Sequence, residues 1–351
     1  MGAVESSAGG LLQRLLMPAP GDADGYSGRR NAEFPKAHAD SLLLLGHVRL
    51  AVPDAEAARR FYAEGLGARL RPSGDGPLSA VVGPSAFQLP AASAEGGGPG
   101  TTWPGQFYVW VEDIKKTLSD CQDLANRLSK QVDEIVEEVH RVTAEDAVDA
   151  LLIRDPVGGN LFLVNQAPAK LVEKMRCLGR DDGEESTTPN LLAIVDAAHA
   201  VPKGKAAAAA RFYSHFLGAA VTKRDGGYCS GPGYSVHFSF GDRLRQTLTF
   251  LEEADDDAGE AGPPQGICEV CMYMPSEEKF RTAFTRCATA GLVDGLNQTW
   301  EAVLEAKEFA VSRCYDPSTQ TDAIELGHVI RHPQHPDLPI TIATPSLAEE
   351  V

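Results

Sequence analysis

The sequence lacks a long apolar run, an excess of basic residues and a regular set of cysteines. Its densest apolar stretch, at residues 42–45, is far shorter than the roughly 18 to 20 residues that cross a membrane, so we expect no membrane span. Lys and Arg number 32 against 49 Asp and Glu, and the net charge of −17 disfavours nucleic acid as a partner. Seven irregularly spaced cysteines do not suggest a disulfide framework, so we expect a reducing, cytoplasmic environment.

The chain also lacks the short motifs that mark nucleotide, calcium and zinc-knuckle sites. Its glycine-rich stretches at 96–98 and 231–234 do not link a strand to a helix, as a phosphate-binding loop would. The acidic run at 252–257 lacks the spacing and the closing glutamate of an EF-hand. Cys268 and Cys271 form a C-x-x-C pair, but no second pair stands nearby, so we interpret them as core thiols.

Length and composition predict two folded units. The chain has 351 residues, of which 43% are hydrophobic and 23% charged, as is typical of globular proteins. The first residues lack the pattern of a secretory signal, although Gly2 fits a loose N-myristoylation pattern. We expect the following organisation: a flexible leader at 1–39, folded halves at 40–168 and 190–332, a linker at 169–189 and an irregular tail at 333–351.

An internal repeat relates the two halves. The phrase LLLLGHVRLAVP at 42–53 aligns without a gap with LLAIVDAAHAVP at 191–202, and an alanine-rich segment follows each. These segments continue as RFYAEGLGA and RFYSHFLGA, which favours a helix packed on a sheet in both copies. Gly67 and Gly218 stand where a helix ends and a positive φ is needed.

Each half divides again into two quarters with one common pattern. A strand comes first, a helix follows, and further strands complete the unit, as the change from alternating to helical apolar spacing indicates. We place the quarters at 42–93, 105–168, 190–252 and 266–332. The predicted fold class is therefore α+β, with four βαβββ modules.

These phrases together resemble the vicinal oxygen chelate superfamily, which includes glyoxalase I, fosfomycin resistance proteins and extradiol dioxygenases. The resemblance is carried by HVRLAVPDAEAARRFYAEGLGARL, YVWVEDI and RDPVGGNLFLV, with weaker copies in ARFYSHFLGAAV and YDPSTQTDAIELG. It implies a tandem fold in which the four modules form two curved, barrel-like sheets, with two quarters in each. It also implies that the concave face of such a sheet holds a divalent metal ion. The implied ion is Zn, Ni, Mn, Mg or Fe, and it chelates neighbouring oxygens of a small substrate.

The resemblance also implies ligand positions on the opening strand and the last strand of each quarter. In quarter order these positions hold the pairs His47 and Gln88, Gln106 and Leu163, Asp196 and Thr249, and Glu269 and Glu325. Leu163 stands where family enzymes usually carry Glu. The acidic residues lie between apolar neighbours on expected strands, where a carboxylate needs a partner. The implied metal ligands are His47, Gln88, Asp196, Glu269 and Glu325.

Two ways of pairing the quarters remain open. Sequential pairing combines the third quarter with the fourth and gives an acidic pocket of Asp196, Thr249, Glu269 and Glu325. Exchanged pairing, as in fused glyoxalase I proteins, combines the first quarter with the fourth and groups His47, Gln88, Glu269 and Glu325. Glu269 and Glu325 belong to the better site in either case.

The leading functional hypothesis is a metal-dependent, glyoxalase-like lyase or isomerase, in which Glu325 is the base that moves a proton between adjacent carbons. The alternative is a non-catalytic small-molecule binding or sequestering protein of the bleomycin-resistance type, which the loss of Glu at Leu163 favours. A ring-cleaving dioxygenase would need two histidines and one carboxylate, which neither pairing supplies. We expect a monomer or homodimer with a small-molecule substrate.

Overall fold

The structure is a computed structural model of the chain. It describes residues 42–71, 77–92, 101–128, 130–140, 150–178, 189–224, 233–240, 244–253, 268–295 and 299–338. Within these ranges, no helix is long and apolar enough to cross a membrane. The expected leader at 1–39, with Gly2, and the end of the expected tail at 339–351 lie outside the described residues.

Sheet A combines the first quarter with the fourth and has seven strands, in the order β14-β17-β13-β1-β4-β3-β2. The first quarter supplies β1 (Leu44–Arg49), β2 (Arg69–Arg71), β3 (Leu78–Val82) and β4 (Ser85–Leu89). The fourth supplies β13 (Glu269–Tyr273), β14 (Glu308–Val311) and β17 (Gly327–Arg331). At the antiparallel junction of β1 with β13, His47 lies opposite Cys271 and Arg49 lies opposite Glu269.

Sheet C has eight strands and combines the second quarter with the third, in the order β10-β11-β12-β9-β5-β8-β7-β6. The second quarter supplies β5 (Gly105–Val111), β6 (Val136–His140), β7 (Ala150–Arg154) and β8 (Leu161–Gln166). The third supplies β9 (Leu191–Val201), β10 (Ala220–Arg224), β11 (Gly233–Phe240) and β12 (Leu244–Glu252). At the antiparallel junction of β5 with β9, Tyr108 lies opposite Asp196 and Gln106 lies opposite Ala198.

The strands therefore follow the exchanged pairing of the quarters. The predicted fold class is confirmed, since two mixed sheets with a small number of helices match a tandem glyoxalase-like fold, but neither sheet closes into a barrel. Gln246 on β12 joins the two sheets, because its side chain accepts from the backbone N–H of Leu45 at 3.1 Å and donates to Ser85 Oγ and Ile194 O, both at 2.9 Å. Its bonds reach β1, β4 and β9 at once.

The helices begin at residues that satisfy their first backbone N–H groups. They are α2 (Ala55–Arg60) with the π-helical turn η1 (Phe61–Gly65), α3 (Ile114–Arg127), the 3₁₀ turn η2 (Val132–Glu134), α4 (Ala169–Leu178), α5 (Ala206–Phe216), α6 (Glu277–Thr289) and α7 (Trp300–Ala306). Asp54, Asp113, Ser276 and Thr299 cap α2, α3, α6 and α7. Lys205 precedes α5 and makes no such bond, and Glu252 Oε1 of β12 accepts instead from Ala206 N at 3.3 Å.

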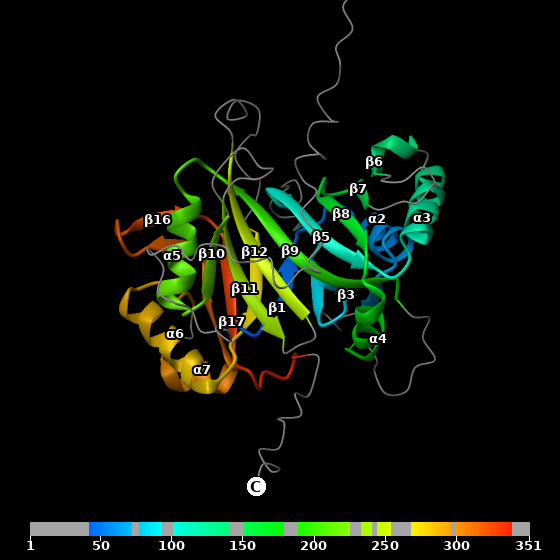
Figure 1. Cartoon of the computed structure of the whole chain (residues 1–351). Coiled ribbons are helices and arrows are strands. Elements are labelled where there is room, and N and C mark those ends of the chain that lie inside the picture. Colours follow the sequence, from blue (N-terminus) through cyan, green and yellow to red (C-terminus); the bar gives the residue numbers. More distant parts are fainter. Residues whose placement is uncertain are drawn as a thin grey trace, which may run out of the picture.

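The helices pack in sequence order although the strands do not. Cys121 of α3 contacts the carbonyl of Gly65 in η1 at 3.5 Å, and Arg286 of α6 donates to the carbonyl of His215 in α5 at 2.6 Å. Figure 1 shows α2 and α3 on one side of the molecule and α5, α6 and α7 on the other. The helices of quarters one and two, and those of quarters three and four, thus form two separate groups.

The repeated Phe-Tyr pair provides the centre of each helix-facing core. Phe61 and Tyr62 contact Phe162 of β8 with ring centroids 5.7 and 5.9 Å apart, and Tyr213 contacts Phe250 of β12 at 5.5 Å. Gly67 follows the first pair with a φ of 74°, as the sequence predicts. A Cβ there would lie 2.6 Å from that of Asn190, so glycine is also needed for close packing.

Two segments depart from the expected pattern. Residues 169–178, expected as part of a linker, form α4, whose Leu171 and Val172 pack against a buried cluster that contains Trp110, Leu192 and Tyr273. The remainder of that linker, at 179–188, lies outside the described residues. The fourth quarter contains α7, and of the last three strands expected there sheet A has two, since the outermost is reduced to one bridge between Asp294 and Ala310.

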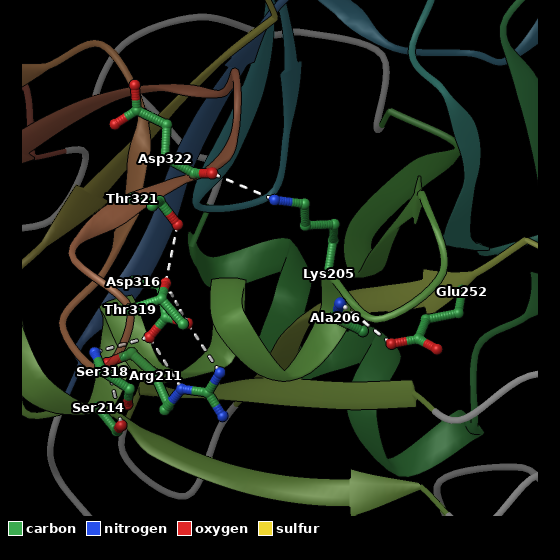
Figure 2. Close-up of polar contacts among 10 residues, drawn as sticks. All are labelled: Lys205, Ala206, Arg211, Ser214, Glu252, Asp316, Ser318, Thr319, Thr321 and Asp322. Carbon is green, nitrogen blue, oxygen red and sulfur yellow. Dashed lines mark hydrogen bonds and ion pairs between the residues drawn. The ribbon is translucent and has the colours of Figure 1, made fainter.

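The fourth quarter also contains a separate hairpin of β15 (Cys314–Asp316) and β16 (Thr321–Ile324), which packs against α5. In Figure 2, Arg211 of α5 makes a bidentate ion pair with Asp316, with N–O distances of 3.0 and 2.9 Å. Asp316 also accepts from Ser318 N and Thr319 Oγ1 at 2.9 and 3.2 Å, and Lys205 Nζ donates to the carbonyl of Asp322 at 3.3 Å. This contact fastens the fourth quarter to the helix that covers sheet C.

Candidate functional site

The helices that follow the opening strands cover one face of each sheet, and α4 packs at one end of the opposite faces. Residues paired across neighbouring strands point to the same side of a sheet, as do residues two apart on one strand. Val48 and Phe87 pack into the core that holds Phe61 and Tyr62, so the alternate position His47 belongs to the opposite face of sheet A. We call these opposite faces the sheet A face and the sheet C face.

His47 and Glu269 both lie on the sheet A face, on neighbouring strands. His47 is 6% exposed, and its burial, reinforced by the positive charges of Arg331 and Arg49, lowers the pKa of His47 to about 3. Glu269 is less buried, and its Oε1 lies 3.7 Å from Arg49 Nη1. Arg49 therefore places a positive charge beside this carboxylate, where a metal ion would otherwise supply it.

Gln88 also belongs to this face, because it pairs with Arg49 across β1 and β4. Glu325 is placed differently from the expectation: it is exposed and precedes β17, which begins at Gly327. In sheet C, Gln106 pairs with Leu161, and Leu163 lies two residues further along β8. In sheet A, Glu269 pairs with Gly327, and the residue two further along β17 is Val329. Val329 therefore occupies the last-strand position in the fourth quarter.

The β15–β16 hairpin accounts for this difference. It lies between β14 and β17 in the sequence and makes their connection long. The equivalent connection in the second quarter, between β7 and β8, is only the tight turn at Asp155. Spacing from the Asp-Pro turn consequently points to Glu325 in the sequence, whereas strand pairing points to Val329. An apolar side chain stands where the resemblance implies a carboxylate.

The sheet C face carries a hydrogen-bonded group around Asp196. Thr249 Oγ1 lies 2.9 and 3.0 Å from the two carboxylate oxygens of Asp196, and 2.9 Å from Ser235 Oγ. On the same face, Thr222 Oγ1 lies 2.7 Å from His237 Nε2. Asp196 and Thr249, both selected from the sequence, are thus in direct contact, and sheet topology separates them from Glu269.

Arg224 supplies the countercharge for Asp196. Its Nη2 lies 3.4 Å from Asp196 Oδ2, and both side chains are largely buried. Burial raises the pKa of Asp196, while Arg224, Thr247 and Thr249 act in the opposite direction. Burial together with Arg224 and Arg245 lowers the pKa of His237 to about 4. At neutral pH the face therefore contains a buried acid, a guanidinium and a neutral imidazole.

The half of the sheet C face formed by the second quarter is apolar. Tyr108, Leu152, Leu163 and Ala198 belong to one buried cluster, with Leu161 and Val195 packed against it. Gln106 stands at the border between the two halves, because it pairs with Leu161 on one side and Ala198 on the other. It is 7% exposed, and its Nε2 has no hydrogen-bond partner among the described residues.

The donors on the two faces do not fit the implied divalent metal. The described ranges contain no group of three or more His, Cys, Asp or Glu side chains that could hold a metal ion. Two like unit charges 4 Å apart repel by about 4 kcal/mol at an effective dielectric constant of 20, and a divalent ion beside Arg49 or Arg224 would meet twice that repulsion. Among the described residues, His47, Gln88, Asp196, Glu269 and Glu325 therefore do not come together as one such group.

Sequence reasoning missed Arg49 and Arg224. Arg49 could have been found, because it lies two residues after His47 and a strand places both on one face. Arg224 gives no local signal, since it lies on the outermost strand of sheet C and meets Asp196 only in the folded sheet.

Comparisons with known proteins agree with this fold. Residues 44–164, which span the first two quarters, match the model of the glyoxalase/bleomycin resistance protein/dioxygenase superfamily. A glyoxalase I mutant from Zea mays is 14% identical, with a TM-score of 0.50 over 83% of this chain and 94% of that one. The 2,2',3-trihydroxybiphenyl 1,2-dioxygenase from Sphingomonas wittichii is 13% identical, with a TM-score of 0.28 over 83% of this chain and 90% of that one.

No curated protein sequence matches the chain significantly. The structural likeness shows the fold alone, whereas the family match rests on the sequence of the first two quarters. The sequence of residues 44–164 thus matches the glyoxalase/bleomycin resistance protein/dioxygenase superfamily, and the described residues as a whole share the tandem fold of glyoxalase I.

Proposed function

We propose that this protein binds a small molecule on the sheet C face without a divalent metal ion. The observation that carries the proposal is the Nε2 group of Gln106, a donor without a partner on a side chain that is 7% exposed. A buried donor without an acceptor costs about 1 to 3 kcal/mol, and a ligand oxygen would remove that cost.

The composition of the sheet C face supports the same function. Small-molecule sites are lined mainly by apolar side chains, with a few polar groups that fix the orientation of the ligand. Tyr108, Leu152 and Leu163 form the apolar part, and Asp196 with Thr249 forms the polar part. Gln106, between the two parts, can orient a ligand that contacts both.

A metal-dependent, glyoxalase-like lyase is less well supported by the residues. Such an enzyme needs convergent metal ligands and a carboxylate to move the proton, but Glu325 is exposed outside β17 and Val329 takes the strand position. His47 and Glu269 remain on one face, beside Arg49. We therefore propose a binding protein of the bleomycin-resistance type rather than a lyase.

A fragment screen tests the proposed function. Full-length protein is screened by thermal shift against small aromatic molecules that bear one polar group, and hits are mapped by amide chemical-shift changes. We expect the largest shifts on β5, β9 and β12, and weaker binding in a Gln106→Leu variant. A screen without hits, or hits that map to sheet A alone, would contradict the proposal.

The lyase alternative is tested by metal content and turnover. We expect the purified protein to hold no stoichiometric Zn²⁺, Ni²⁺ or Mn²⁺ and to show no isomerisation of a glutathione hemithioacetal when these ions are added. Stoichiometric metal that is lost in Glu269→Ala or Glu325→Ala would instead favour the lyase.

A further inference from the structure

Arg224 and Asp196 interact although their strands are not neighbours in sheet C. Arg224 ends β10, the outermost strand, and Asp196 lies on β9, with β11 and β12 between them. Neighbouring strands are about 4.8 Å apart, so three intervals span about 14 Å in a flat sheet. The contact of 3.4 Å between Arg224 Nη2 and Asp196 Oδ2 therefore requires the side chain to cross β11 and β12 and the sheet to curve toward this face.

The guanidinium of Arg224 consequently lies over the polar half of the face. The row beneath its path contains Thr222, Ser235 and Thr249, which occupy paired positions on β10, β11 and β12. A guanidinium has five N–H donors in one plane, so it can bond Asp196 and a further oxygen at the same time.

Gln106 extends this row by two strands. Thr249 pairs with Ala198, and Ala198 pairs with Gln106, so the small alanine side chain separates Thr249 from the amide. Gln106 and Asp196 also occupy equivalent positions on the opening strands of the second and third quarters. Each directly precedes one member of the antiparallel pair Phe107 and Ala197, so the two lie diagonally across β5 and β9. The partnerless Nε2 and the guanidinium therefore belong to one face at the centre of sheet C.

We propose that Arg224 is the fixed cation of the sheet C face and that, with Gln106 Nε2, it binds a carboxylate or carbonyl oxygen of the ligand. The proposal rests on the proposed function and adds the chemical class of the ligand. Asp196 holds the guanidinium in place over the face. The apolar body of the ligand lies on Leu152, Leu163 and Tyr108.

The experiment uses 2-naphthoate, which combines an apolar ring system with a carboxylate, as the probe. Its dissociation constant is measured by titration calorimetry for full-length wild type and for Arg224→Met, Gln106→Leu and Lys223→Met. Lys223 precedes Arg224 on β10 and pairs with Tyr234, which belongs to the helix-facing core, so it carries the same charge on the other face. We expect binding at least tenfold weaker in Arg224→Met, several-fold weaker in Gln106→Leu and unchanged in Lys223→Met.

Two further measurements keep the test decisive. Arg224→Met leaves Asp196 without its countercharge, so the double variant Arg224→Met/Asp196→Asn is measured beside it, with circular dichroism to confirm folding. Addition of Mn²⁺ is expected to leave the wild-type affinity unchanged.

Each contrary result has a distinct meaning. Equal affinities of wild type, Gln106→Leu and the folded Arg224 variants overturn the assignment of these residues, whereas binding mapped to sheet C keeps the proposed function. A requirement for Mn²⁺ overturns the fixed cation. No binding of 2-naphthoate to wild type overturns the ligand class, and the fragment screen then decides the proposed function separately.

Discussion

At the residue scale, the repeated Phe-Tyr pair provides a matched comparison. The tyrosine hydroxyl of the second copy, on Tyr213, lies 2.8 Å from His328 Nε2, whereas the hydroxyl of Tyr62 is buried and has no partner in the described part of the chain. Phe162 and His328 occupy equivalent positions on β8 and β17. Each comes one residue after the strand partner of Gln106 or Glu269. One copy therefore has a polar ring where the other has an apolar ring, which explains the isolated hydroxyl.

We predict that Tyr213→Phe destabilises the protein by about 1 to 3 kcal/mol and that Tyr62→Phe is neutral or stabilising. The first change leaves His328 Nε2 without its hydroxyl, while the second removes a buried group that makes no bond. The free energy of unfolding is measured by urea titration for both variants. Equal losses of stability in the two variants would contradict this explanation.

At the element scale, one largely buried ion pair joins the β15–β16 hairpin to α5, beside the core contacts of Cys314 and Ile324. Arg211 and Asp316 form a bidentate contact whose acid is buried, and the hairpin is otherwise a two-stranded sheet outside the two large ones. Burial opposes the charge of Asp316, but the bonds from Arg211, Ser318 and Thr319 lower the pKa of Asp316 to about 2. The acid is therefore charged at neutral pH and needs its partner.

We expect Asp316→Asn to lower the free energy of unfolding markedly. Loss of one partner from a buried pair costs about 3 to 5 kcal/mol, and the partial exposure of Arg211 reduces the effect here. The surface pair of Arg313 with Asp322 in the same segment is the matched control, because Asp322→Asn is expected to cost less than about 1 kcal/mol. Similar costs for the two variants, measured by chemical denaturation, would show that the Arg211 pair does not fasten the hairpin.

At the scale of the whole molecule, each sheet takes strands from both halves while the helices pack within each half. β1 pairs with β13 and β5 pairs with β9, so neither half contains a complete sheet. A half expressed alone would expose both opening strands as unpaired edges. The four quarters are therefore interlocked rather than arranged as two independent domains.

We predict that residues 40–178 alone do not form a folded monomer. The fragment aggregates or pairs with itself through its two opening strands, and co-expression with residues 189–338 restores a 1:1 complex. Light scattering after gel filtration, combined with circular dichroism, distinguishes these states. A monomeric fragment that unfolds cooperatively would refute the interlocked arrangement.

The local part of the fold could be predicted because its causes are local. Apolar periodicity, capping residues such as Asp54 and Asp113, and Gly67 with its positive φ act within a few residues of chain. Repetition of the Phe-Tyr phrase then extended the pattern from the first quarter to the third. In the fourth quarter the β15–β16 hairpin lengthens the connection before β17, which is why the spacing rule selected Glu325 instead of Val329.

By itself the sequence determined four units of one kind and their strand-helix order, and the first two of these units match a superfamily model. Tertiary structure alone decided which opening strands pair, because all four are buried apolar strands that differ little in what they can pair with. It also decided that Arg224 meets Asp196, since that contact arises from the curvature of a sheet across three strand intervals. No short stretch of sequence encodes a curvature that many strands produce together.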